Sequence, residues 1–169
     1  ERVARRAFRL ARERRRSVCS VDRAGELATG RLWRREVARV ARDYPDVSLR
    51  HMDIESCAAA LLHSPAQFDV LVGDALFGAI LARQAVALAG APGVLPGACV
   101  GDGRPALYQP AHGPAWDIAG RDTANPIAMI LCAAMMLRQS LHLGNEADCV
   151  ETAVKNVLEA GWRTADLAA

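Results

Sequence analysis

The chain has 169 residues, of which 51% are hydrophobic and 24% charged, with a net charge of +2. This length and apolar content favour one globular domain or two small lobes and exclude a disordered chain. Because no apolar run reaches the roughly 18 residues that a membrane-spanning helix needs, we expect a soluble cytoplasmic protein without a membrane partner.

The first part of the chain alternates amphipathic helices with short apolar strands. Helical spacing predicts helices over 1–14, 23–44 and 55–64. β-Branched or alternating segments predict strands over 17–21, 47–54 and 68–73. Arginines crowd the first helix, and we interpret them as a solvated face rather than a nucleic-acid site. This order of elements predicts an α/β fold with a parallel or mixed sheet covered by helices.

From Gly90 to Pro126 the sequence is rich in glycine and proline, which predicts a long functional loop. An apolar helix over 127–141 follows, and a last amphipathic helix over 146–161 ends at a glycine cap. The Met and Ala stripe of the apolar helix is typical of packing against a sheet rather than of a cofactor site. The cysteines form no C-x-x-C pair, so they predict reduced core thiols rather than metal ligands.

Several segments carry a specific resemblance. They are "SVDRAGEL", "SPAQFDVLVGDALFGAIL", "GVLPGACVGDG", "LYQPAHGPAWDIAGRDTANP" and "GWRTADL". In this order they resemble the C-terminal half of the isocitrate, isopropylmalate and tartrate dehydrogenases, a family of metal-dependent β-decarboxylating enzymes. The resemblance implies an isopropylmalate dehydrogenase-like α/β fold, with a mixed sheet covered by helices. It assigns 1–95 to the second part of the small, dimerisation domain with its connecting helix and 96–169 to the returning part of the large, nucleotide-binding domain.

The resemblance also implies a reaction. In the family a divalent ion chelates a 2-hydroxy acid, hydride passes to NAD or NADP, and the product loses carbon dioxide. Two aspartates on one helix and one from the partner subunit hold the ion, a lysine of the partner subunit is the base, and a tyrosine is the acid.

This chain departs from that pattern at the metal and base positions. The two helical aspartates correspond to Ala79, which has no donor atom, and Arg83, which is a cation. The partner subunit's aspartate corresponds to Glu55, and the lysine corresponds to Arg23, which stays protonated near neutral pH. We therefore expect no bound magnesium or manganese, and Arg23, Glu55 and Arg83 become degenerate catalytic positions.

The nucleotide loop of the family is retained. Its pattern is matched by His112, Gly113, Asp117, Ile118 and Asn125. In the family the aspartate meets the adenosine ribose hydroxyls, while the histidine and asparagine lie beside the adenine, and an acidic residue there favours NAD. The loop could equally persist as scaffold alone. Trp116 stands where proline is common and could either block the adenine pocket or cover it.

The sequence leaves several functions open. A repurposed metal-independent enzyme, or a non-catalytic regulatory or scaffold homologue (a pseudoenzyme), would use Arg83 and Arg23 to bind a small anion. Arg83 could instead pair with Glu55 across a subunit interface. An active NAD-dependent isopropylmalate or tartrate dehydrogenase would need Glu55, Asp53 or Asp74 as substitute ligands.

A third hypothesis is an interaction domain that dimerises through 23–44 and 76–88. For every hypothesis we expect a homodimer, or a heterodimer with a paralogous subunit or with a chain that supplies the N-terminal half. Because Glu1 is not an initiator methionine and the family's N-terminal half is missing, we expect either that the sequence continues upstream or that another chain completes the fold.

Overall fold

The computed structural model describes residues 1–103 and 105–168. Contacts divide the chain into two compact units, Glu1–Ala85 and Val86–Ala169. The division falls inside the helix that runs from Ala75 to Leu88. None of the helices in the described ranges has both the length and the apolarity needed to span a bilayer.

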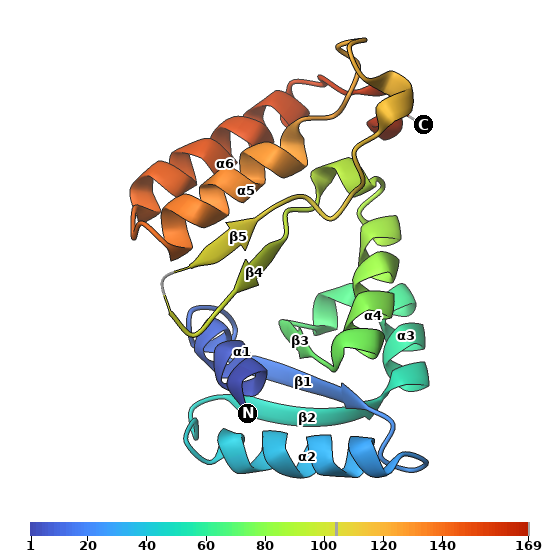
Figure 1. Ribbon diagram of the computed structural model, residues 1–169, viewed down its shortest axis with the longest axis vertical. Coiled ribbons are helices and arrows are strands. Elements are labelled where there is room, and N and C mark those ends of the chain that lie inside the picture. The colour runs from blue at the N-terminus through green and yellow to red at the C-terminus, as the bar shows by residue number, and fades with distance from the viewer. Residues whose placement is uncertain (104, 169) are drawn as a thin grey trace. The chain divides into compact units, whose positions relative to one another are not determined.

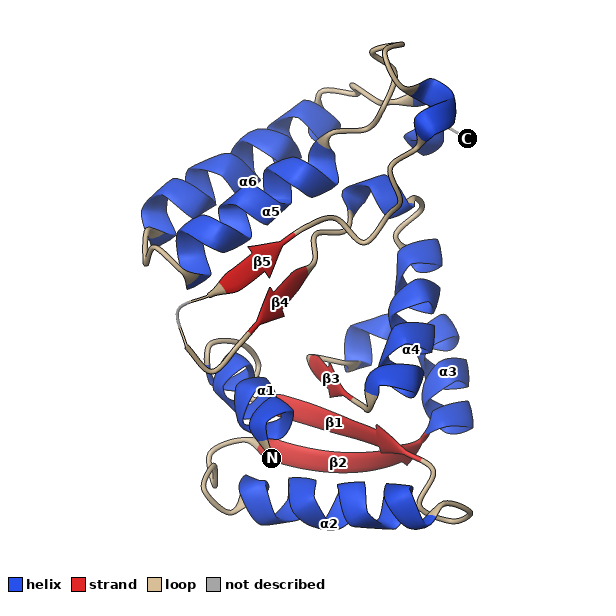
Figure 2. Ribbon diagram, in the orientation of Figure 1, coloured by secondary structure: helices blue, strands red, loops and turns tan. Residues whose placement is uncertain are grey.

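The first unit is an α/β layer structure (Figures 1 and 2). Its elements are α1 (Arg2–Arg12), β1 (Ser17–Asp22), α2 (Ala28–Ala41), β2 (Ser48–Asp53), α3 (Ile54–His63), η1 (Pro65–Gln67), β3 (Val70–Val72) and α4 (Ala75–Leu88). The strands pair in the order β2-β1-β3, and both pairs are parallel. Because β1 is central, its side chains are buried on both faces of the sheet.

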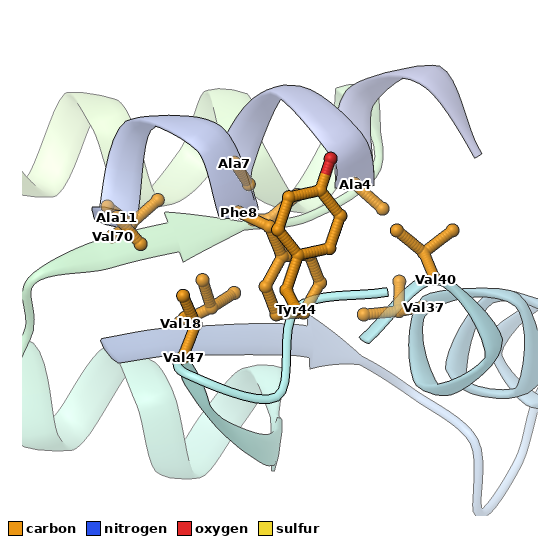
Figure 3. Close-up of a cluster of buried hydrophobic side chains, with 11 residues drawn as sticks. Ala4, Ala7, Phe8, Ala11, Val18, Val37, Val40, Tyr44, Val47 and Val70 are labelled. Carbon is orange, nitrogen blue, oxygen red and sulfur yellow. The ribbon is translucent and has the colours of Figure 1, made fainter. Parts of the chain in front are cut away.

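Alternation along β1 sends successive side chains to opposite faces. Val18 joins a cluster with α1 and α2, while Cys19 and Val21 join a second cluster with α3 and α4. In the first cluster the rings of Phe8 and Tyr44 stack with centroids 5.1 Å apart (Figure 3). The two clusters therefore hold helices on both faces of the sheet, as the order of elements predicts.

The second unit consists of a β-hairpin and a pair of helices (Figure 2). Its elements are η2 (Pro92–Val94), β4 (Ala98–Val100), β5 (Ala106–Tyr108), η3 (Trp116–Ile118), α5 (Ile127–Gln139), α6 (Gly144–Glu159) and η4 (Ala165–Leu167). Strands β4 and β5 are antiparallel, and α5 packs against both α6 and β5. Gly161, at φ 90°, follows the end of α6, which agrees with the predicted glycine cap.

Three expectations about local structure need correction. The helix expected from Arg23 begins at Ala28, because residues 23–27 form a turn closed by a hydrogen bond from Leu27 N to the Arg23 carbonyl. The long loop contains the hairpin β4–β5, which its short strands concealed. All five cysteines are free, but Cys99 and Cys149 are exposed rather than core residues.

We expect Phe8→Ala to lower the free energy of unfolding by about 3–5 kcal/mol, because it removes a fully buried ring and leaves a cavity. Urea unfolding followed by circular dichroism measures the loss. The control is Leu10→Ala on the same helix, where the side chain is 39% exposed and the loss should stay below about 1 kcal/mol. Equal losses for the two variants would contradict the packing described for this cluster.

Candidate functional site

The first set of candidate residues lies where the parallel strands end. Strand β1 ends at Asp22 and β2 at Asp53, and these two residues are paired in the register of the sheet. Arg23 directly follows β1, and Glu55 lies in the first turn of α3, just after β2. The carboxyl ends of parallel strands share one edge, so the sheet itself brings these two elements together.

A buried carboxylate shapes the turn that carries Arg23. Asp22 is 2% exposed, and its Oδ1 accepts a hydrogen bond from Ala24 N at 2.9 Å. Arg34 of α2 donates to both oxygens of Asp22, from Nε at 2.9 Å and from Nη2 at 2.7 Å. This pairing raises the pKa of Arg34 above its ordinary value, so the guanidinium remains charged. A bidentate pair of this kind fixes both position and orientation.

A close backbone approach constrains the same turn. A Cβ atom at Gly30, in the first part of α2, would lie 2.7 Å from the carbonyl carbon of Arg23 and 2.9 Å from Ala24 N. Real Cβ atoms do not approach backbone this closely, so a side chain at residue 30 would force the turn to move. The start of α2 therefore rests directly on the backbone of Arg23.

The structure brings Arg23 and Glu55 together. The Arg23 guanidinium forms an ion pair with the Glu55 carboxylate, and its Nε lies 2.7 Å from Glu26 Oε2. The Arg23 side chain is 30% exposed and both carboxylates are 60% exposed. Within this chain Glu55 thus pairs with Arg23, the cation that occupies the family's lysine position.

A histidine of β2 faces the buried carboxylate. His51 Nδ1 lies 3.9 Å from Asp22 Oδ2, and within the described ranges it has no hydrogen-bond partner. Burial and the nearby Arg34 lower the pKa of His51, although Asp22 opposes them. The imidazole is therefore neutral near pH 7, and Arg34 remains the principal cation that neutralises Asp22.

The second set of candidate positions lies on α4. Asp74 precedes this helix, and its Oδ1 accepts a hydrogen bond from Phe77 N at 2.8 Å, as an N-cap does. Ala79 and Arg83 follow four residues apart and both are exposed. A methyl group and a guanidinium offer no oxygen to a cation, so these two positions do not fit a divalent ion.

Two other carboxylates considered as metal ligands already have partners. Glu55 is paired with Arg23, and Asp53 Oδ1 lies 3.5 Å from Arg34 Nη2. Over residues 1–103 and 105–168, no group of three or more His, Cys, Asp or Glu side chains is arranged to hold a metal ion.

The candidate nucleotide residues lie in the second unit. His112 Nδ1 lies 2.9 Å from the Gly113 carbonyl oxygen, and Asp117 is exposed within the one-turn helix η3. Ala115 and Gly120 have positive φ angles of 49° and 74°, so the chain turns sharply on both sides of η3.

This turn forms a hollow of about 400 Å³. Its lining comes from a single loop and consists of Pro114, Ala115, Ile118, Ala119, Gly120, Asp122 and Ala124. Of the predicted nucleotide residues, Ile118 therefore contributes to its wall.

Asn125 is held by two hydrogen bonds. Its Oδ1 accepts from Ile127 N at 3.0 Å, at the start of α5, and its Nδ2 donates to Asp166 Oδ2 at 3.0 Å. The side chains of Thr164 and Asn125, with the nearby His112, keep the pKa of Asp166 below its usual range, although burial opposes them. A Cβ atom at Gly93 would lie 2.8 Å from both Asn125 Nδ2 and Asp166 Oδ2, so the packing here is tight. The C-terminal η4 thus orients a residue of the nucleotide loop.

Sequence reasoning missed Asp22, Arg34 and Asp166. Asp22 directly follows the strand predicted over 17–21. Its position therefore indicates that an acidic side chain lies at the edge of the sheet. Nothing in the sequence indicates that Arg34 would reach it, or that Asp166 would meet Asn125, since these pairs depend on tertiary packing.

Comparisons with known proteins agree with this architecture. The family model described as isocitrate/isopropylmalate dehydrogenase matches residues 1–169. The 3-isopropylmalate dehydrogenase of Nitratidesulfovibrio vulgaris is 55% identical over 166 residues, which cover 98% of this chain and 46% of that protein. The corresponding enzyme of Gloeobacter violaceus is 50% identical over 169 residues, covering 100% of this chain and 47% of that protein. This chain therefore spans about half the length of the curated relatives it matches.

Two solved structures have the same fold. The isocitrate dehydrogenase from Methylococcus capsulatus matches with a TM-score of 0.92 and 38% identity, over 99% of this chain and 50% of that chain. A beta-decarboxylating dehydrogenase from Thermococcus kodakarensis matches with a TM-score of 0.90 and 36% identity, over 98% of this chain and 48% of that chain. These matches bear out the expected fold class.

We expect Asp22→Asn to lower the free energy of unfolding by about 2 kcal/mol, because it removes the charge that Arg34 binds in a buried setting. Thermal and urea unfolding measure the change. Asp53→Asn is the matched control, since that carboxylate is 53% exposed and lies 3.5 Å from the same guanidinium. The free energy of unfolding of the control should fall by less than about 1 kcal/mol. A larger loss in Asp53→Asn than in Asp22→Asn would refute the pairing of Asp22 with Arg34.

The contact of Asp166 predicts loss of stability in acid. Its folded pKa lies below the ordinary value of 3.8, so its contribution is present above that value and is lost as the pH falls through the folded pKa. Melting temperatures measured from pH 6 down to pH 2.5 should therefore fall less steeply in Asp166→Asn than in the parent protein at the acid end of the range. Parallel curves for the two proteins would show that Asp166 does not contribute to stability in this way.

Proposed function

Since this chain belongs to the isocitrate/isopropylmalate dehydrogenase family, we propose that it is a homologue without the family's metal-dependent oxidative decarboxylation. It would act as a metal-independent enzyme or as a non-catalytic regulatory or scaffold subunit. The observation that carries this proposal is the pair of exposed α4 positions, where Ala79 and Arg83 replace two carboxylates. Without those oxygens a divalent ion has too few ligands from this chain.

The base position supports the same proposal. Arg23 replaces the lysine and is occupied by an ion pair with Glu55. A guanidinium that stays protonated cannot accept a proton from a substrate hydroxyl. It can bind a carboxylate or phosphate through two parallel hydrogen bonds, so we propose a small anion as the ligand of Arg23 and Arg83, which would have to replace Glu55 as the partner of Arg23.

The second unit would contribute adenine nucleotide binding. Asp117 is exposed and available to ribose hydroxyls, and Asn125 is oriented by Asp166 near the same loop. The dinucleotide NAD fits this arrangement better than NADP, because a carboxylate repels a 2′-phosphate. When bound in a dehydrogenase, NAD accepts hydride; in this chain His112, Gly113, Asp117, Ile118 and Asn125 would hold its adenosine part.

We propose that the protein acts in the cytoplasm as an assembly of two chains. In the family's arrangement, the base position and one ligand position come from the partner subunit, so Arg23 and Glu55 would face the α4 positions of a second chain. The partner would be a copy of this chain, a paralogous subunit, or a chain that supplies the N-terminal half. The proposal needs neither nucleic acid nor a membrane.

A second candidate is an active NAD-dependent 3-isopropylmalate or tartrate dehydrogenase. The observation in its favour is the 55% identity to a protein named 3-isopropylmalate dehydrogenase. It requires Glu55, Asp53 or Asp74 to act as substitute ligands. Each of these carboxylates has another partner: Arg23, Arg34 and Phe77 N, respectively. Metal binding would first have to break these contacts.

Titration calorimetry with manganese, together with NADH formation from isopropylmalate, malate and tartrate, tests the proposal. We expect no tight manganese site and no metal-dependent NADH formation in the parent protein. The triple variant A79D/R83D/R23K restores the family's residues and should bind manganese at least tenfold more tightly, with R83D alone as the control for simple removal of positive charge.

Tight manganese binding with metal-dependent NADH formation in the parent protein would favour the second candidate. If the triple variant gains no affinity, the surroundings of these positions differ from the family's in more than the ligands. Co-purification of a paralogous dehydrogenase would favour a regulatory subunit over a metal-independent enzyme.

A further inference from the structure

The Arg23 guanidinium lies between two carboxylates that come from different elements. Glu26, in the same turn, places Oε2 2.7 Å from Arg23 Nε, and Glu55, in the first turn of α3, pairs with Arg23 Nη1. We propose that these two carboxylates form an autoinhibitory contact, which keeps Arg23 from binding an anion until one of them is displaced. This inference rests on the anion binding proposed for Arg23, and it gives a role to Glu26.

The two carboxylates engage different donors of the guanidinium. An arginine binds a carboxylate or phosphate best through two parallel hydrogen bonds, which come either from Nε with Nη2 or from Nη1 with Nη2. Glu26 occupies Nε, a donor of the first pair, and Glu55 occupies Nη1, a donor of the second pair. A two-point contact with an incoming anion therefore requires that one of the carboxylates leaves.

The charges of this cluster also oppose an additional anion. Glu26 and Glu55 supply two negative charges to the single positive charge of Arg23, so the three side chains together are negative. Two like charges about 5 Å apart in water repel each other enough to change a binding constant about fourfold. Each carboxylate that stays in place therefore weakens the binding of an anion to Arg23.

The carboxylates are free to move, whereas the backbone that carries the cation is held. Both carboxylate side chains are 60% exposed, and among the residues that the structure describes, Arg23 is the only basic side chain that pairs with either of them. Exposed ion pairs of this kind contribute little to stability. The backbone of Arg23, by contrast, is confined by the close approach of Gly30. A competing anion would therefore displace a carboxylate while Arg23 keeps its place.

Calorimetric titration of the full chain with inorganic phosphate at low ionic strength tests this inference. Glu26→Gln and Glu55→Gln each remove one competing charge, so each variant should bind phosphate about three- to fivefold more tightly than the parent protein. The double variant should bind phosphate about tenfold more tightly. Because the gain acts through one cation, adding Arg23→Gln to the double variant should abolish it.

Glu36→Gln is the matched control. The Glu36 carboxylate pairs with Arg39 at 3.0 Å, three residues away on the chain, as Glu26 does with Arg23. Its removal takes the same charge from the same unit at a different cation, so phosphate affinity should stay within about twofold of the parent protein. A gain as large as that of Glu26→Gln would show an effect of overall charge and would overturn the inference.

The remaining outcomes separate this inference from the proposed anion binding. Equal phosphate affinity in the parent protein and in the double variant, together with loss of binding in Arg23→Gln, would overturn the autoinhibitory contact and leave Arg23 as the anion site. A gain that survives Arg23→Gln would also overturn the contact. If neither the parent protein nor the double variant binds phosphate, or if Arg23→Gln does not weaken binding, the proposed anion binding at Arg23 fails and the inference fails with it.

Discussion

A charge that cannot be left unpaired inside the protein organises the edge of the sheet. Asp22 ends the central strand among buried neighbours, where an isolated carboxylate would be destabilised by several kcal/mol. Arg34 and the backbone of Ala24 satisfy it, and those contacts fix the turn after β1. These contacts determine where the backbone of Arg23 lies. They therefore also determine that the Arg23 side chain can pair with Glu55.

The chain combines a familiar scaffold with altered charge. The family's reaction needs oxygen ligands around a hard cation, whereas the corresponding positions here supply a methyl group and guanidinium groups. Guanidinium groups match carboxylates and phosphates in shape as well as in charge. Under the proposed function, the same backbone would bind a different class of ligand, although helices, strands and core packing need not change. Fold and activity are separable in this way because activity depends on a few side chains.

Hydrophobic periodicity was sufficient to predict most helices and strands of the first unit and its α/β class. It failed at residues 23–27, because the side-chain contact of Asp22 with Ala24 N competes with helix formation in a way that periodicity does not report. It also missed β4 and β5, since the glycines and prolines that flank these short strands are typical of a loop. The partnership of Asn125 with Asp166 joins residues 41 positions apart, and no local signal encodes it. Candidate positions could be named from sequence, but their partners could not.

The close approach of Gly30 to the backbone of Arg23 makes positions 30 and 23 interdependent, although they lie seven residues apart in the sequence. A residue without a side chain lets α2 lie against the backbone of Arg23, so any substitution at position 30 displaces position 23 before its own chemistry matters. Libraries that vary residue 23 to recover or change activity should therefore hold residue 30 constant.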